Sequence, residues 1–196
     1  MAQVRSIAIV NGHPDSSPSH LCSAIAKAYL AGASAAGHEC ELIQIGDLEF
    51  DLLRSEAEYA GPVPPALQPA ANSLIAADHV VLIYPLWLGT LPAATKAFLE
   101  QVFHKETVFE QPEGARFPIG KFKGKSARII VTMGMPTLIY RYFYGAHSLK
   151  SLERNIFKFI GFKPVRDTVF GMVEAVGDAK RQKWLRQVEQ LGRRVR

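Results

Sequence analysis

The chain is poor in cysteine and has no long apolar run. Only Cys22 and Cys40 are present, far apart and without C-x-x-C spacing, which argues against a disulfide framework or a zinc site and favours a reducing, cytoplasmic setting. No apolar stretch approaches the roughly 20 residues that a membrane-spanning helix needs. No signal-peptide pattern precedes the first apolar segment. We therefore expect a protein without membrane spans.

Two common nucleotide-binding motifs are also missing. Neither G-x-G-x-x-G nor G-x-x-x-x-G-K-[ST] follows the first apolar run, which disfavours a Rossmann dinucleotide site and a P-loop there. No nucleic-acid-binding motif is present either, so we expect no nucleic acid among the partners of this protein. Acidic residues are outnumbered, with 18 Asp and Glu against 23 Lys and Arg, and the net charge is +5. This excess fits anionic small ligands, an anionic membrane surface or a simply basic exterior, and much of it lies in 180–196, where a solvated helix face is the favoured interpretation.

What the chain does contain is a regular alternation of strand-like and helix-like segments. Apolar runs predict strands at 4–10, 39–45, 79–84, 126–132 and 164–171. Amphipathic or alanine-rich segments predict helices at 21–36, 66–76, 92–103, 146–160 and 178–194, with connections at 47–65, 104–124 and 134–145. Repeated βα units predict an α/β fold with a parallel sheet and helices on both faces. We expect one domain over residues 1–196.

One stretch organises the rest of the chain. Residues 80–84 are uninterruptedly apolar, as in a strand that is buried on both faces. A short turn with Trp87, Gly89 and Pro92 leads into the next helix, and ligands bind where the strands of a parallel sheet end. An exposed Trp87 needs cover, which a flat cofactor ring supplies. The alternative is a core aromatic beneath the helix, which is the commoner role of tryptophan.

The loop after the first strand, 11–20, is rich in hydroxyl groups and imidazoles. We expect Ser17 to cap the following helix, with Pro18 at its first position. No acidic residue follows before Glu39, so the start of this helix can hold a phosphate. A capped turn without a ligand is an equally good interpretation, and Asp15 counts against an anion unless it points to solvent.

A third motif, Thr132-Met133-Gly134-Met135-Pro136, follows the fourth strand, and Gly134 permits close approach of a ligand to the backbone. Taken alone, the later His147 is best explained as a helix cap or a core histidine. In the flavodoxin-like strand order 2-1-3-4-5, the turns after strands one and three flank the point where FMN lies. Three individually weak motifs thus form one coherent site.

The pattern P-x-W-x-x-x-L-P-A-x-x-K-x-F-L-E-x-V-F over residues 85–103 resembles the signature of the flavodoxin-like NAD(P)H:quinone oxidoreductases. This family includes DT-diaphorase-type enzymes, modulators of drug activity and ancillary subunits of glutathione-gated potassium efflux systems. The loop at 12–15 with Ser19 resembles its phosphate loop. Two turns depart from the family pattern: Ser19-His20-Leu21 replaces a frequent Ser-Phe-Asn, and 133–136 replaces a turn with two glycines.

The resemblance implies a non-covalently bound FMN, with FAD left open, and a homodimer with the site at the subunit interface. It places His13, Ser19, His20 and Leu21 at the flavin phosphate, Pro85, Leu86, Trp87 and Leu88 at the isoalloxazine ring, and Thr132, Met133, Gly134 and Met135 at its pyrimidine side. It implies a catalytic pair, Tyr140 and His147, with Tyr142 and Tyr144 as alternatives to Tyr140.

The activity implied is a two-electron, ping-pong hydride transfer from NAD(P)H to a quinone or a related azo or nitro acceptor. A second interpretation is a regulatory flavoprotein subunit of a membrane transporter, peripheral to the membrane and with little turnover of its own. A one-electron flavodoxin carrier is disfavoured, because such carriers meet their partners through acidic surfaces and this chain is basic.

Overall fold

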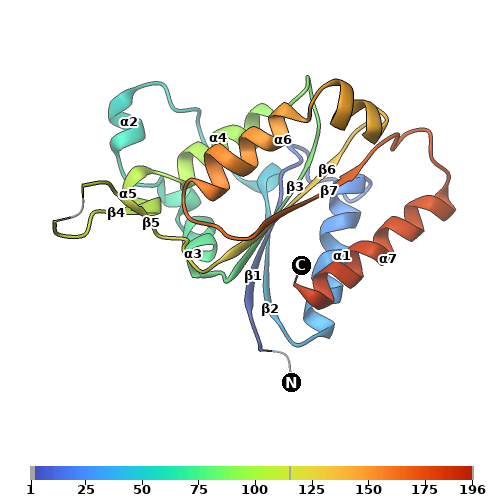
Figure 1. Ribbon diagram of the computed structural model, residues 1–196, viewed down its shortest axis with the longest axis horizontal. Helices are drawn as coiled ribbons and strands as arrows, with labels where there is room; N and C mark the ends of the chain where they lie inside the picture. Colours follow the sequence, from blue (N-terminus) through green and yellow to red (C-terminus); the bar gives the residue numbers. More distant parts are fainter. Residues whose placement is uncertain (1–2, 115, 196) are drawn as a thin grey trace.

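The computed structural model describes residues 3–114 and 116–195, without the side chain of residue 106. Arg196, the last residue of the basic terminal segment, lies outside this part. The centre is a five-stranded sheet with the order β2-β1-β3-β6-β7 (Figure 1). All neighbouring strands are parallel. Since β6 and β7 are the fourth and fifth strands of this sheet along the chain, the predicted order 2-1-3-4-5 is confirmed. The strands are β1 (Ser6–Asn11), β2 (Glu39–Gln44), β3 (His79–Pro85), β6 (Ser126–Thr132) and β7 (Val165–Phe170).

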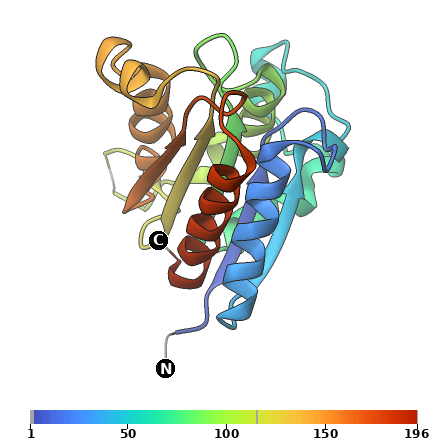
Figure 2. The ribbon, with the colours of Figure 1, turned by 90° about the vertical axis from the view of Figure 1, so that its right-hand side faces the viewer.

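Helices cover both faces of the sheet because successive strand residues point to opposite sides. Ile7 and Ile9 pack with α1 (Leu21–Ala35) and α7 (Asp178–Arg194), whereas Ala8 and Val10 belong to the core on the other face. That second core includes side chains of α3 (Gln68–Ala76), α4 (Ala93–Val102) and the helical segment that starts at α6 (His147–Ser151). The two views show α1 and α7 side by side (Figures 1 and 2).

Two glycines let α1 and α7 approach backbone to backbone. A Cβ atom on Gly32 would lie 2.8 Å from the carbonyl carbon of Glu189, and one on Gly192 would lie 3.0 Å from the amide nitrogen of Ala33. Both distances are shorter than ordinary contacts of about 3.5–4.0 Å. The close crossing therefore depends on the missing side chains.

The predicted connections contain short elements that the sequence patterns did not reveal. The segment 47–65 holds α2 (Glu56–Ala60), between the 3₁₀ turns η1 (Ile45–Asp47) and η2 (Pro65–Leu67). The segment 104–124 holds α5 (Lys105–Val108) and an antiparallel pair, β4 (Phe109–Glu110) with β5 (Ile119–Gly120). The connection 134–145 contains the π-type turn η3 (Ile139–Phe143), and the helix predicted at 146–160 widens after α6 into the π-type segment η4 (Leu152–Lys158).

The predicted cap of α1 is wrong. The helix begins at Leu21, His20 is its N-cap, and no side chain caps it. The Ser17 hydroxyl group lies 2.8 Å from that of Ser19, and the His20 amide donates to the Ser17 carbonyl at 3.3 Å. A separate turn therefore precedes the helix.

None of the helices in 3–114 and 116–195 has both the length and the apolarity that a membrane crossing requires.

Candidate functional site

A cavity of about 270 Å³ lies where β1, β3 and β6 end. Three segments far apart in the sequence meet there: the loop after β1 with the start of α1, the turn after β3, and the turn after β6. A fourth segment, after β7, closes one side. The lining residues are His13, His20, Leu21, Cys22, Pro85, Leu86, Trp87, Thr132, Met133, Gly134, Val173 and Glu174.

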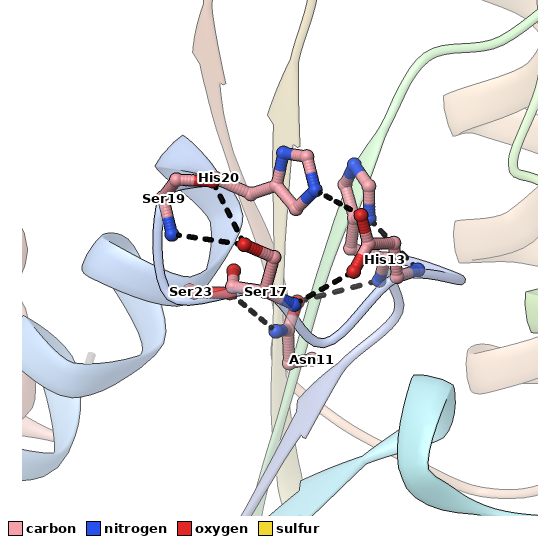
Figure 3. Close-up of polar contacts among 7 residues, drawn as sticks. Asn11, His13, Ser17, Ser19, His20 and Ser23 are labelled. Carbon is pink, nitrogen blue, oxygen red and sulfur yellow. Dashed lines mark hydrogen bonds and ion pairs between the residues drawn. The ribbon is translucent and has the colours of Figure 1, made fainter.

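Asn11, the last residue of β1, fixes the loop that follows it. Its fully buried side chain donates to the Ser23 hydroxyl group at 3.2 Å and to Gln44 Oε1 at 2.8 Å, and its Oδ1 accepts from the His13 amide at 3.3 Å. The contacts with Ser23 and His13 are drawn in Figure 3. Because one amide links α1, β2 and the loop, the position of His13 is set by the core.

Two histidines stack at the edge of the cavity. The ring centroids of His13 and His20 are 3.9 Å apart and nearly parallel, and the Asp15 carboxylate lies 2.7 Å from His20 Nε2. The Asp15 amide donates to His13 Nδ1 at 3.1 Å, so the proton of the neutral His13 ring is on Nε2, which leaves an N–H donor. Burial, and then the neighbouring His20, lower the pKa of His13.

The first turn of α1 has no acidic residue and no capping side chain, so its amide groups and the positive end of the helix dipole are available to an anion. Asp15 adds one negative charge close by: the hydrogen bond from His20, followed by that from the Ser17 amide, lowers the pKa of this carboxyl group, and its carboxylate lies 2.7 Å from His20 Nε2. Helix starts with free amides bind phosphate and other anions. The loop has the donors for such a ligand.

Trp87 stands in the turn after β3 and is not part of the core. Its side chain is 48% exposed, and its ring meets that of His13 edge to face at 5.5 Å. The amide and carbonyl groups of Trp87 pair with those of Thr90, and Leu88 and Gly89 between them have φ values of 46° and 79°. This tight turn holds the indole beside the cavity. The core-aromatic interpretation of Trp87 is therefore wrong.

The turn after β6 forms the opposite wall. The Thr132 hydroxyl group lies 3.3 Å from Cys22 Sγ, and the Met133 amide donates to the Phe170 carbonyl at 2.9 Å. A Cβ atom on Gly134 would meet no atom within 4 Å, so the backbone faces open space. The cavity thus combines a loop with hydrogen-bond donors, an exposed aromatic ring and an accessible backbone segment.

A match with a family model decides the relationship. Residues 5–192 match the model described as "Flavodoxin-like fold". The chain belongs to this flavodoxin-like family.

Several proteins similar to this flavodoxin-like chain are named as oxidoreductases. It is 26% identical over 141 residues to an "Uncharacterized NAD(P)H oxidoreductase" of Haemophilus influenzae, which covers 69% of each chain. It is 30% identical over 112 residues to an "FMN-dependent NADH:quinone oxidoreductase" of Bacillus cereus, covering 57% of this chain and half of that protein. The structure of the NAD(P)H:quinone oxidoreductase from Methanothermobacter marburgensis has the same fold, with a TM-score of 0.83 at 20% identity over 99% of this chain and 100% of the other.

The flavodoxin-like chain brings most of the predicted cofactor residues to one cavity. Ser19, Leu88 and Met135 are the predicted residues that do not line it. Ser19 bonds to Ser17 at the surface, Leu88 is fully exposed, and Met135 packs against the core. The roles of these residues stay predictions.

Three lining residues of this flavodoxin-like site were not predicted: Cys22, Val173 and Glu174. Cys22 follows Leu21 directly, so the predicted helix start could have indicated it. The Val173 amide donates to the Met133 carbonyl at 3.1 Å, and this bond brings the segment after β7 to the cavity. No local motif marks that contact.

Tyr140 and His147 do not line this cavity. Tyr140 is buried, with its hydroxyl group 2.9 Å from that of Ser148, and His147 is exposed at the start of α6. The competing Tyr142 and Tyr144 are 82% and 52% exposed. The predicted catalytic pair therefore lies outside this cavity, in the part of the chain that follows the turn after β6.

A larger apolar hollow of about 600 Å³ also borders the turn after β3. It shares Trp87 with the cavity of about 270 Å³, hereafter the cofactor cavity. It also includes Ser148, whose hydroxyl group contacts that of Tyr140. Most of its other lining residues are apolar: Leu88, Leu91, Pro92, Ala93, Leu152 and Ile156, beside Thr90, Lys96 and Ser151. One indole thus borders both spaces.

Proposed function

We propose that this protein is a flavin-dependent NAD(P)H:quinone oxidoreductase that works by two-electron, ping-pong transfer. The observation that carries the proposal is the convergence of the loop with hydrogen-bond donors, the half-exposed Trp87 and the open backbone at Gly134 on one cavity. The names of the relatives and the family match support the same activity.

The residues present fit FMN. The stacked His13 and His20 and the uncapped start of α1 suit its phosphate. Trp87 offers an aromatic surface for a flat ring, and the turn at 132–134 offers backbone with open space before it. Bound FMN would supply the chemistry itself, accepting hydride from NAD(P)H and passing it to a quinone.

The chain's own groups would orient the cofactor and stabilise the charge that develops. His13 presents its Nε2–H while Asp15 holds the ring of His20, so both imidazoles are positioned before an anion binds. Fixed donors lower the cost of reorganisation when negative charge increases. We assign this stabilising role at the far edge of the flavin to Tyr140 and His147, as the family resemblance implies.

We also propose a homodimer, as the family resemblance implies. The segment that carries Tyr140 presents Leu138, Tyr142 and Phe143 with exposed fractions of 69%, 82% and 80%. Exposed apolar side chains gathered in one segment are typical of an interaction surface. A second copy that covers them would bring further groups to the larger hollow, which suits a planar apolar acceptor.

The test is the absorption spectrum of the purified protein after incubation with FMN and removal of the excess. We expect a yellow protein that NADH or NADPH bleaches under anaerobic conditions and that a quinone such as menadione recolours. His20→Ala is expected to lower the affinity for FMN at least tenfold, whereas Lys27→Ala, on the exposed side of α1, retains it. A protein that stays colourless at saturating FMN would contradict the proposal.

A further inference from the structure

A second polar hollow lies at the amino ends of the strands, opposite the cofactor cavity. Its volume is about 490 Å³. Five segments meet there: the residues before β1, β3 and β7, the start of β6, and the end of α7. Both ends of the described chain lie toward this side of the molecule (Figure 2). The hollow is lined by Gln3, Arg5, Asp78, Gly124, Ser126, Lys163, Pro164, Arg166, Arg194 and Val195.

Positive charge dominates this hollow. Arg5, Lys163, Arg166 and Arg194 line it together with a single carboxylate, Asp78. Asp78 already accepts a hydrogen bond from the Ser6 amide at 3.0 Å. Within 3–114 and 116–195, none of the four cations forms an ion pair with a carboxylate.

The neighbouring residues show that ion pairs do form close by. Arg193, the residue before Arg194, pairs with Glu189 at 2.7 Å, and Asp167, the residue after Arg166, pairs with Arg141. The carboxylates of Glu189 and Asp167 are thus engaged outside the hollow. The mutual repulsion of the four clustered cations costs free energy, and a bound anion would relieve it.

The buried group behind the hollow responds to the same charges. His79 is 1% exposed, its Nδ1 lies 2.8 Å from the hydroxyl group of Ser126, and its Nε2 has no hydrogen-bond partner in the described chain. Burial first, and then the positive charges of Arg128, Arg5 and Arg166, lower the pKa of His79 to about 3. Two cations of the hollow, Arg5 and Arg166, thus act on a buried group that contacts Ser126.

We propose that this hollow is a binding site for a phosphate-bearing anion with at least two negative charges. The guanidinium groups of Arg5 and Arg166 are suited to bidentate contacts with phosphate oxygens, and Ser126 adds a hydroxyl group. A volume of about 490 Å³, against about 30 Å³ for a water molecule, leaves room for more than one phosphate group. The site is separate from the cofactor cavity and does not depend on the proposed function.

The phosphate has two possible sources with the same chemistry: a small soluble diphosphate or a phosphomonoester headgroup in a membrane. Lys163, Arg166 and Arg194 are exposed, so either source can reach the hollow. In both cases the anion would contact residues of several segments that meet at this edge of the sheet. Binding should therefore stabilise the folded state.

The probe is inorganic pyrophosphate, and the experiment is run both without and with saturating FMN, so that any binding of the probe at the loop 11–20 is recognised by its loss when FMN is present. We expect the melting temperature to rise with pyrophosphate at constant ionic strength. The double variant Arg5→Gln/Arg166→Gln should weaken binding at least tenfold in calorimetric titration. The control, Lys183→Gln/Arg186→Gln, removes the same charge from the exposed side of α7 and should bind as the wild type does.

A parallel arm measures co-sedimentation with vesicles that contain phosphatidic acid or phosphatidylserine at equal net charge. Binding to phosphatidic acid alone that is lost in Arg5→Gln/Arg166→Gln supports the site with a lipid source, and a pyrophosphate response alone supports a soluble source. If the double variant and its control behave alike in both arms, or if neither probe binds, the proposal is overturned. Loss of flavin binding would not imitate this result, because neither double variant alters a residue that lines the cofactor cavity.

Discussion

Replacing Gly32 with alanine should separate α1 from α7. The new methyl group would lie 2.8 Å from the carbonyl carbon and 3.0 Å from the Cα of Glu189, about 0.5–0.7 Å inside an ordinary contact of roughly 3.5 Å. Both atoms are backbone, so no side-chain rotation relieves the overlap, and α7 has to move as a unit. Trp184 and Val188 on α7 pack in the same core and would lose contacts.

The magnitude follows from two opposed effects. Overpacking costs about 1–3 kcal/mol, and alanine recovers up to about 1 kcal/mol of helix propensity relative to glycine. We place the overpacking cost at the upper end of this range because the backbone must shift. The expected net loss is about 2 kcal/mol, which lowers the melting temperature by roughly 4–8 °C in a chain of this length.

The assay is urea and thermal unfolding of Gly32→Ala beside Gly177→Ala. Gly177, the N-cap of α7, has φ of −74° and open space where a Cβ would lie. The weaker capping by alanine opposes its lower unfolded-state entropy, so this variant should stay within about 1 kcal/mol of the wild type. In the double variant Gly32→Ala/Gly192→Ala the losses should be less than additive, because one separation makes room for the second methyl group. A Gly32→Ala protein as stable as the wild type would refute the close crossing.

Three further outcomes are expected. Asn11→Ala should cost about 1–3 kcal/mol, because it leaves buried groups unpaired, and should weaken FMN binding; unchanged urea unfolding would contradict the anchoring role of Asn11. The folded protein keeps His79 neutral with a pKa of about 3, against 6.5 unfolded, so this residue's contribution is complete above pH 6.5 and declines as the pH falls from 6.5 toward 3. His79→Gln should flatten that part of the stability profile, and an unaltered slope would exclude His79 as the cause. Tyr142→Glu should shift a dimer toward monomer in analytical ultracentrifugation and lower quinone reduction without loss of FMN; an unchanged sedimentation coefficient would argue against this surface as the interface.

The buried strands and the long helices were predictable, because their patterns are local and strong. The residues of β3 and β6 are buried throughout, so their apolar runs identify them without context. The amphipathic α7 was predicted with its observed bounds. Since the order of a parallel α/β sheet fixes which strand ends meet, the site followed from the fold.

Shorter elements escaped because their stability comes from particular contacts. The pairing of β4 with β5 involves two residues on each strand, too few for any periodicity. Ser55 caps α2 by accepting from the Glu58 amide at 3.2 Å, and the S-x-x-E spacing could have indicated this helix. Glu174 was missed because the bond from Val173 to Met133 joins distant segments.

Trp87 lines both the cofactor cavity and the larger apolar hollow, and this limits how the protein can be redesigned. With the function proposed above, any substitution there would alter cofactor retention and acceptor choice together, so a change in turnover could not be ascribed to either. Ser151 borders only the larger hollow of the two. Diversity introduced at Ser151 would explore acceptor range on a constant cofactor background, whereas a library at Trp87 would mix the two traits in every clone.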